Sequence, residues 1–279
     1  MNNRYLSIGC QRSRKGLRLI CFLFFSLLSG FSSSSMAEEY SFVVQPILSP
    51  QKTIEAFTPL TEYLSEATGH KIRLVTALNF LSYWETMKKS GQYDFILDAA
   101  HLTDYRQQRM GYQVLVKRPD VVSYTLVTSI NADIIEPEEL IGKSVATIGS
   151  PSLGMLRVDK MFPNPLRQPM IVEVNNSTES IQKVLDGKAI GAMIPTPLVG
   201  LYPDLVTIVT TEQVPHTAIS AAPSVPDDVK QAVRNALVSA STTERGKEML
   251  TAIKFPGFEP TNKKTYKGFA GLLEGTWGY

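Results

Sequence analysis

Cysteine is nearly absent from this sequence, which has only two among its 279 residues. Both of them, Cys10 and Cys21, lie within the first 37 residues. A chain that loses this segment has no thiol, which excludes a disulfide, a cysteine-ligated zinc site and a cysteine nucleophile. The same 37 residues also lack aspartate and glutamate, although they hold five of the 28 basic residues.

These first 37 residues have the composition of a secretory signal peptide. An apolar run at 19–31, rich in Leu, Ile and Phe, follows the basic residues Arg4, Arg12, Arg14, Lys15 and Arg18. The run is too short to span a bilayer comfortably, and Ser35 and Ala37 put small residues where a signal peptidase reads them. We therefore predict cleavage after Ala37 and export to the periplasm. The alternative is an uncleaved anchor, whereas a lipid anchor would need a cysteine directly after the apolar run.

Removal of the leader reverses the net charge of the chain. The whole sequence has 28 basic and 26 acidic residues, and without the five leader cations 23 basic residues face 26 acidic ones, a net charge of −3. The apparent pI of 8.4 therefore gives no support to nucleic-acid binding. The remaining 242 or so residues suffice for one large or two small domains. No later segment approaches 18 uncharged apolar residues, so no further membrane segment is expected.

Apolar runs rich in Val, Ile and Leu alternate with amphipathic stretches from Tyr40 almost to the C-terminus, which predicts an α/β protein with largely parallel sheets. Strands are expected at 41–48, 71–77, 93–97, 112–116, 121–128, 144–148, 170–174, 189–194, 205–210 and 216–222. Helices are expected at 50–68, 79–89, 101–110, 151–161, 177–185, 226–240 and 244–253. Pro59 should kink or divide the first of these helices.

Two polar turns suggest that one α/β segment is inserted into another. The turn at 131–137 is interpreted as the first crossing between two lobes, and residues 211–215 as the return crossing. The predicted division is a signal peptide at 1–37, the first part of lobe 1 at 38–128, lobe 2 at 129–212, and the rest of lobe 1 with the C-terminal helices at 213–279.

Several short segments together resemble one known family. They are Phe-Thr-Pro-Leu-Thr-Glu-Tyr-Leu at 57–64, Ser-Gly-Gln-Tyr-Asp-Phe at 90–95, Ser-Tyr-Thr-Leu-Val at 123–127, Glu-Leu-Ile-Gly-Lys at 139–143 and Ser-Pro-Ser-Leu-Gly at 150–154. Their order and spacing, over about residues 40–245, resemble the periplasmic phosphate, phosphite and phosphonate-type substrate-binding proteins of ABC transporters. The resemblance implies the type II periplasmic-binding fold, with two α/β lobes, each a mostly parallel sheet flanked by helices, joined by two crossing segments.

The same resemblance implies a function and its partners. Such a protein captures a small oxyanion by hinge closure and delivers it, as a monomer, to a membrane ABC permease. An alternative role is a sensory module that presents its closed form to a membrane sensor kinase or cyclase. A third class, an enzyme on this fold, lacks support because the sequence offers neither a nucleophile elbow nor a P-loop lysine. No cofactor, metal or nucleic acid is expected.

The segment at 150–154 is the main candidate for ligand binding. It follows a predicted strand and opens a predicted helix, so the backbone N–H groups of Ser152, Leu153 and Gly154 should be free beside the hydroxyls of Ser150 and Ser152. Such a helix start binds phosphate-like groups without a formal positive charge. Strand-to-helix turns at the carboxyl edge of open α/β sheets are also where ligands bind. The alternative is an ordinary helix cap.

Three more residues are candidates, one near the first crossing and two in lobe 2. The resemblance implies that Tyr124 meets the ligand, although a strand aromatic can equally pack. Asn176 and Ser177 form a second strand-to-helix turn, where relatives carry histidine and where a helix cap would also explain both residues. Relatives that bind amine-bearing phosphonates have an acidic residue near the strand at 191–195, and none stands there.

From lobe 1, Phe80, Tyr83, Asp98 and His101 are candidates for the wall of the cleft. Asp98 and His101, three residues apart, have the chemistry of a metal pair, but the sequence shows no third ligand. A cap at the start of the helix is the alternative role for Asp98.

Overall fold

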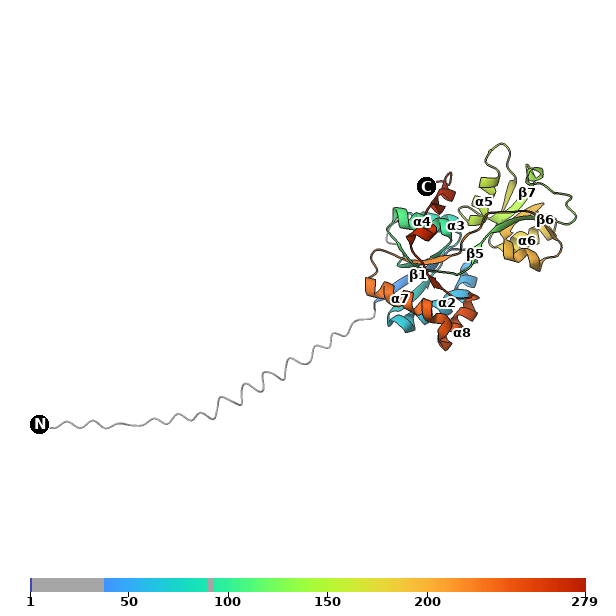
Figure 1. Cartoon of the computed structure of the whole chain (residues 1–279). Helices are drawn as coiled ribbons and strands as arrows, with labels where there is room; N and C mark the ends of the chain where they lie inside the picture. The colour runs from blue at the N-terminus through green and yellow to red at the C-terminus, as the bar shows by residue number, and fades with distance from the viewer. Residues whose placement is uncertain (2–37, 90–92) are drawn as a thin grey trace. The chain divides into compact units, whose positions relative to one another are not determined.

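The computed structural model describes residue 1, residues 38–89 and residues 93–279 of the chain. The predicted signal peptide and its cleavage site lie outside the described residues. Residues 38–279 form one compact unit that contains two separate main sheets, each with its own helices (Figure 1). The predicted α/β class and the two lobes are thereby confirmed. Among the described residues, no helix is long and apolar enough to cross a bilayer.

Lobe 1 is the six-stranded sheet with the helices packed on it. Its strands, in the spatial order β13-β4-β12-β3-β1-β2, are β1 (Glu39–Val44), β2 (Lys71–Val75), β3 (Phe95–Asp98), β4 (Gln113–Lys117), β12 (Ala218–Ala221) and β13 (Glu259–Pro260). Its helices are α2 (Pro50–Thr68), α3 (Phe80–Met87), α4 (Ala100–Arg109), α7 (Asp227–Ser239), α8 (Glu244–Ile253) and α9 (Lys263–Tyr266), with 3-10 turns η3 (Ala240–Thr242) and η4 (Phe269–Leu273). Figure 1 shows α2, α7 and α8 on one side of the sheet and α3 and α4 on the other.

Helix α2 illustrates how local signals and packing combine. It begins after Ser49, whose hydroxyl accepts a hydrogen bond from the Lys52 N–H, and it ends at Gly69 in the left-handed conformation. Pro59 does not divide the helix, which excludes the second of the two predicted effects, a kink or a division. Phe57, Leu60 and other buried side chains hold the helix against the core, and this packing offsets the single backbone hydrogen bond that proline removes.

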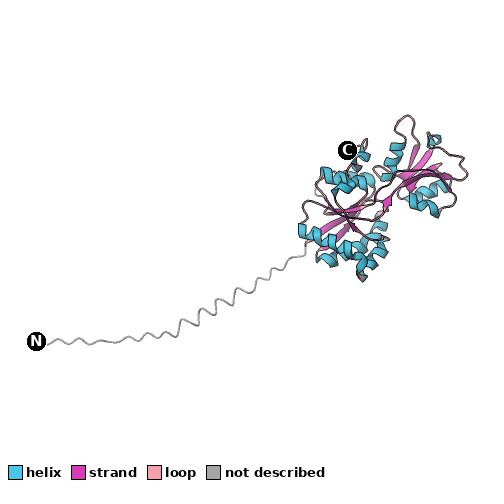
Figure 2. Cartoon of the chain, in the orientation of Figure 1, coloured by secondary structure: helices cyan, strands magenta, loops and turns pink. Residues whose placement is uncertain are grey.

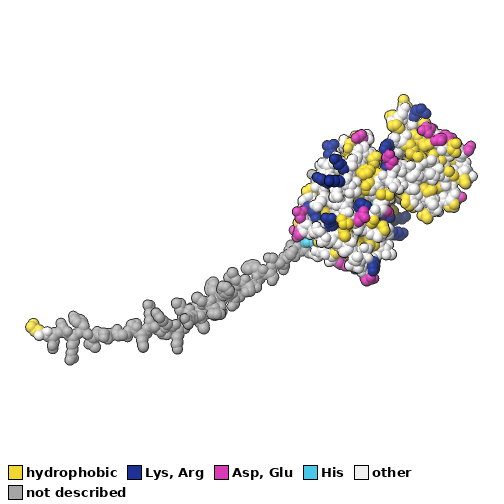
Figure 3. All heavy atoms as spheres, in the orientation of Figure 1, with side chains coloured by type: hydrophobic (Ala, Val, Ile, Leu, Met, Phe, Trp, Pro, Cys, Tyr) yellow, Lys and Arg dark blue, Asp and Glu magenta, His cyan; other side chains and the backbone are white. Residues whose placement is uncertain are grey.

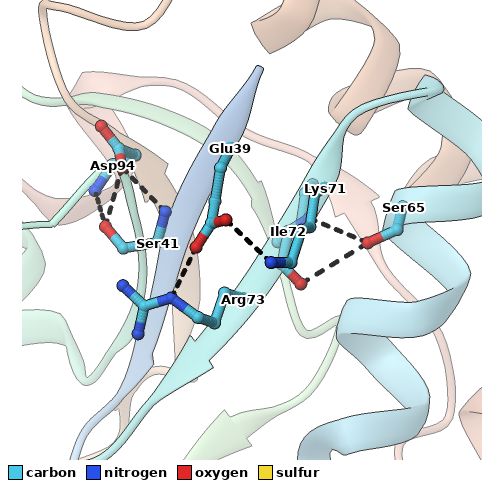
Figure 4. A network of polar contacts seen from close by, with 7 residues as sticks. All are labelled: Glu39, Ser41, Ser65, Lys71, Ile72, Arg73 and Asp94. Carbon is cyan, nitrogen blue, oxygen red and sulfur yellow. Dashed lines mark hydrogen bonds and ion pairs between the residues drawn. The ribbon is translucent and has the colours of Figure 1, made fainter. Parts of the chain in front are cut away.

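The outer edge of the lobe 1 sheet is fixed by polar contacts (Figure 4). Glu39 on β1 pairs with Lys71 and Arg73 on the parallel strand β2, each at 2.8 Å. These exposed pairs lower the pKa of Glu39, chiefly through hydrogen bonds from both cations. Asp94 accepts hydrogen bonds from the Ser41 N–H and hydroxyl, at 2.8 and 2.7 Å, and so ties β1 to the start of β3.

Lobe 2 is the five-stranded sheet with two helices. Its strands, in the spatial order β10-β6-β9-β7-β8, are β6 (Tyr124–Ser129), β7 (Ser144–Ile148), β8 (Met170–Val174), β9 (Gly191–Pro195) and β10 (Leu205–Thr210). Its helices are α5 (Leu153–Met161) and α6 (Ser177–Leu185), with 3-10 turns η1 (Pro137–Leu140) and η2 (Thr196–Leu201). Separate apolar clusters pack on this sheet, one with Ile181 and Val184 of α6 and one with Val158 of α5. Figure 2 shows helices beside the strands in both lobes.

Two features of the topology correct the sequence predictions. Both main sheets are mixed, because β12 pairs antiparallel with β3 and β4, and β6 pairs antiparallel with β9 and β10. The strand predicted at 121–128 is also interrupted at Ser123. Its first residues form β5 (Val121–Val122), which pairs with β11 (Val214–Pro215), whereas β6 already belongs to the lobe 2 sheet. The first crossing is therefore at β5 and not at the polar turn 131–137.

Candidate functional site

A small pocket lies between residues of the two lobes. Its volume is about 20 Å³, and its lining consists of Gln45, Ile47, Phe80 and Ala99 from lobe 1 and Tyr124, Thr147, Ile148, Ser152, Leu153, Gly154, Ser177 and Met193 from lobe 2. None of these side chains carries a formal charge. A space on the scale of one or two water molecules admits only a group of a few heavy atoms in this conformation.

Four helices begin at this pocket. Phe80, Leu153 and Ser177 are the first residues of α3, α5 and α6, and Ala99 is the residue that precedes α4. The N-terminal end of a helix carries unpaired N–H groups and a partial positive charge. The helix ends therefore give the pocket a positive potential that its side chains do not supply.

The turn before α5 shows which predicted donors are free. The Ser152 hydroxyl donates to the Ile148 carbonyl at 2.6 Å and accepts from the Met155 N–H at 3.2 Å, and the Ser152 N–H donates to the Gly149 carbonyl. Ser152 is thus the helix cap, and neither its N–H nor its hydroxyl proton is available to a ligand, contrary to the sequence prediction.

Two of the three predicted N–H donors remain at this turn. Within the described part of the chain, the N–H groups of Leu153 and Gly154 donate to no acceptor. Ser150, whose hydroxyl was expected beside them, lies instead in a neighbouring open groove with Glu173 and Asn175.

Tyr124 and Thr147 approach each other beside Gly154. A Cβ atom placed on Gly154 would lie 2.9 Å from the Thr147 Oγ1 and 3.2 Å from the Tyr124 ring. Burial raises the pKa of Tyr124 to about 12, so its hydroxyl keeps its proton and can donate it. The Thr147 side chain is 1% exposed, and its hydroxyl has no hydrogen-bond partner among the described residues.

Gln45 and Thr147 were not among the residues predicted from the sequence. Gln45 follows β1 directly, and its Oε1 accepts the Ala99 N–H at 3.0 Å, which orients the amide and leaves its NH2 group as a donor. Its position at the carboxyl end of a parallel strand could have identified it. Thr147 lies within β7, where no motif distinguishes it from the other strand residues.

Asn176 and Ser177, which the sequence predicted as neighbouring ligand contacts at the start of α6, have different roles. Ser177 lines the pocket. The Asn176 side chain accepts the Glu179 N–H at 2.9 Å, which is the contact of a helix cap. Asn176 is therefore placed outside the pocket lining.

Tyr83 and Asp98 are placed in a buried network outside the pocket lining, which corrects their expected place in the cleft wall. Asp98 pairs with Arg106 at 2.6 Å and accepts a hydrogen bond from the Tyr83 hydroxyl, and all three side chains are at most 1% exposed. Asp98 is not a helix cap either, since Ala99 precedes α4 without a side-chain contact. Burial, followed by the negative charge of Asp98, raises the pKa of Tyr83 well above its usual value.

His101 contacts the turn beside the pocket without lining the pocket. Its Nε2 lies 2.9 Å from the Pro151 carbonyl, and because a carbonyl only accepts, Nε2 carries the proton. The ring is completely buried, and its Nδ1 has no partner among the described residues. Burial, opposed by the hydrogen bond to Pro151 and aided by the nearby Arg157, lowers the pKa of His101 to about 4. His101 therefore joins α4 of lobe 1 to the turn of lobe 2 as a neutral ring.

The described residues contain no group of three or more His, Cys, Asp or Glu side chains arranged to hold a metal ion. On the face drawn in Figure 3, acidic and basic side chains lie interspersed on lobe 1.

Comparisons with solved structures concern the fold. Methylphosphonate-bound PhnD1 from Prochlorococcus marinus is 11% identical, with a TM-score of 0.73, covering 85% of this chain and 97% of that one. A binding protein component of an ABC phosphonate transporter from Pseudomonas aeruginosa is 13% identical, with a TM-score of 0.71 and coverage of 85% of each chain. ATP-bound XAC2383 from Xanthomonas citri is 12% identical, with a TM-score of 0.69 and coverage of 85% and 97%. These neighbours have the two-lobed periplasmic-binding fold.

Comparison at the level of sequence identifies the family. No curated protein matches the chain. The family described as the periplasmic phosphonate substrate-binding protein of ABC transporters matches residues 42–266. This match covers both sheets except the first three residues of β1, together with both crossing strands and every residue of the pocket lining. The chain therefore belongs to the family of periplasmic substrate-binding proteins of phosphonate ABC transporters.

Proposed function

We propose that the mature chain captures a small oxyanion, such as phosphate, phosphite or a phosphonate, in the pocket between its lobes and delivers it to an ABC permease. The observation that supports this most is the meeting of four helix N-termini at a pocket without a charged side chain. Helix N-termini favour anions through their free N–H groups and their partial charge. The pocket thus suits an anion and gives a cation no side chain of opposite charge.

The lining also restricts the ligand to a small one. Polar donors alternate with the apolar side chains of Ile47, Phe80, Ile148 and Met193, so a short alkyl substituent has apolar contacts available. No carboxylate lines the pocket, and an amine-bearing phosphonate would therefore bury its ammonium group without a counter-charge. We expect alkyl or unsubstituted oxyanions to bind better than aminoalkyl ones.

We propose binding without chemical transformation. The only buried imidazole near the pocket among the described residues, His101, donates to the Pro151 carbonyl and not to a hydroxyl. The Ser152 hydroxyl donates to a carbonyl as well, so it is not activated by a base. Lobe closure of the hinge type, about β5 and β11, would then present the loaded form to the permease.

A thermal-shift screen followed by calorimetry tests this proposal on the mature chain, residues 38–279. A ligand that binds only the folded state stabilises it by about 2.7 kcal/mol at 100 times its Kd. We expect stabilisation by phosphate, phosphite, methylphosphonate or sulfate, and none by lysine or by neutral sugars. Stabilisation by a cationic or neutral compound alone would refute the oxyanion assignment.

Export and delivery have separate tests. N-terminal sequencing of the protein recovered from the periplasm should begin at Glu38. Vesicles that contain the cognate permease should hydrolyse ATP faster when the loaded protein is added. Loaded protein that leaves the ATPase unchanged but stimulates a membrane sensor kinase would assign the sensory role instead.

A further inference from the structure

The Thr147 hydroxyl is a buried polar group without a partner. It lines the pocket on β7, is 1% exposed, and has no hydrogen-bond partner among the described residues. A buried hydroxyl normally has a partner, because leaving one unpaired costs free energy. Its place in the lining, 2.9 Å from where a Gly154 Cβ would stand, puts it beside the free N–H groups at the start of α5.

Gln45 provides a second donor from the opposite lobe. Its Oε1 already accepts the Ala99 N–H at 3.0 Å, so the side of the amide that remains available is its NH2 group. The side chain is 6% exposed and lines the pocket, which leaves it little freedom to turn.

Three acceptors of the lining are already used. Gln45 Oε1 accepts from Ala99, the Ser152 Oγ accepts from Met155, and the Ile148 carbonyl accepts from Ser152. No carboxylate or imidazole belongs to the lining. An anion whose oxygens only accept would satisfy these donors, whereas the proton of a P–OH group would find only the uncharged hydroxyl oxygens of the lining, those of Tyr124, Thr147 and Ser177, to accept it.

We propose that Thr147 and Gln45 are ligand contacts that complete a lining of donors, and that the pocket thereby selects oxyanions that carry no ionisable proton. This inference rests on the proposed function, namely that the pocket binds an oxyanion. It places sulfate and the dianions of phosphonates and phosphite, none of which keeps an ionisable proton, ahead of the singly protonated phosphonates and phosphite and ahead of phosphate, whose dianion still carries a P–OH group.

Calorimetric titration of the mature protein with sulfate and with methylphosphonate between pH 6 and 8.5 tests the selection. Sulfate stays fully ionised over this range, while methylphosphonate loses its second proton within it. The ratio of the two association constants cancels any titration of the protein itself. We expect the ratio of methylphosphonate to sulfate to rise about tenfold per pH unit below the second pKa of methylphosphonate and to level off above it. A ratio that stays constant or falls with pH would overturn the inference.

Variants test the two residues. Thr147→Val should weaken sulfate binding about tenfold or more, since a hydrogen bond to a charged group is lost. Thr128→Val is the matched control, because Thr128 is also 1% exposed with an unpartnered hydroxyl on the same sheet but lies outside the pocket lining. We expect its affinity to equal that of the wild type. Equal affinities for both variants would remove Thr147 from the site.

Gln45→Glu reverses the chemistry at one position. One carboxylate oxygen of the glutamate can still accept the Ala99 N–H. The other takes the place of the Gln45 NH2 group and presents an acceptor to the pocket instead of a donor. We expect this variant to lose sulfate binding by about 100-fold and to bind methylphosphonate best below the second pKa of that ligand. Unchanged preference for sulfate would remove Gln45 from the site. Failure of every oxyanion to bind the wild type at any pH would instead refute the proposed function itself.

Discussion

His101 should make the folded state sensitive to mild acid. Its ring is completely buried, and burial lowers its pKa from 6.5 to about 4. Between these two values the unfolded chain binds a proton that the folded chain does not. The free energy of unfolding therefore falls as the pH is lowered from 6.5 to 4, at up to about 1.4 kcal/mol per pH unit. Between pH 7.5 and 4.5 the loss from this one group is about 2.5 kcal/mol.

Urea unfolding of the mature wild type and of His101→Gln at pH 7.5, 6.5, 5.5 and 4.5 measures this effect. Glutamine has an NH2 group that can donate to the Pro151 carbonyl in place of the ring N–H, but it does not titrate, so the variant loses the proton linkage. The wild type should lose about 2.5 kcal/mol more than the variant over this range, because other titrating groups are common to both proteins. Parallel pH profiles for the two proteins would show that His101 is not held neutral by burial.

His216 is a second buried histidine, away from the pocket, with which the His101 variant can be compared. Burial, and then the nearby Arg118, lower its pKa to about 4 as well, but it flanks β11 and contacts Thr217 rather than the turn at the pocket. His216→Gln should also flatten the pH dependence of stability. It should leave the oxyanion affinity unchanged, because His216 contacts Thr217 and not the turn at the pocket.

Three further substitutions have expected outcomes. Gly154→Ala places a Cβ 2.9 Å from a buried hydroxyl and should lower oxyanion affinity about tenfold or more by calorimetry; Gly200→Ala, where nothing lies within 4 Å, should not. Tyr124→Phe removes a donor and should weaken binding by about 1 to 2 kcal/mol without loss of stability, and unchanged affinity would place the hydroxyl outside the site. Asp98→Ala leaves Arg106 buried without its partner and should cost about 3 to 5 kcal/mol in urea unfolding, a loss that an exposed pair would not show.

Local signals in the sequence determined much of the fold. The alternation of apolar and amphipathic stretches predicted the α/β class, and Ser49, Gly69 and Asn176 marked helix ends that the structure contains. These features act over a few neighbouring residues, so they can be recognised without knowing the tertiary fold. The turn at 150–154 was likewise recognisable, because a strand followed directly by a capped helix is a local pattern.

The tertiary structure alone decided which groups of that turn are free and what surrounds them. Residues 121–128 form one strand-like run rich in Val and Thr, and only the pairing partners reveal that it divides at Ser123 between the crossing and lobe 2. Asp98 has the chemistry of a ligand contact, but in the folded chain it is paired with Arg106 on α4, the next helix. Thr147 had no sequence signal, since its unpaired hydroxyl is defined by strands and helices distant in the chain. The sequence by itself predicted an α/β chain with a capped helix start of the kind that suits anions, and contacts between distant segments decided the donors of the pocket, because burial and hydrogen-bond pairing are properties of the folded chain.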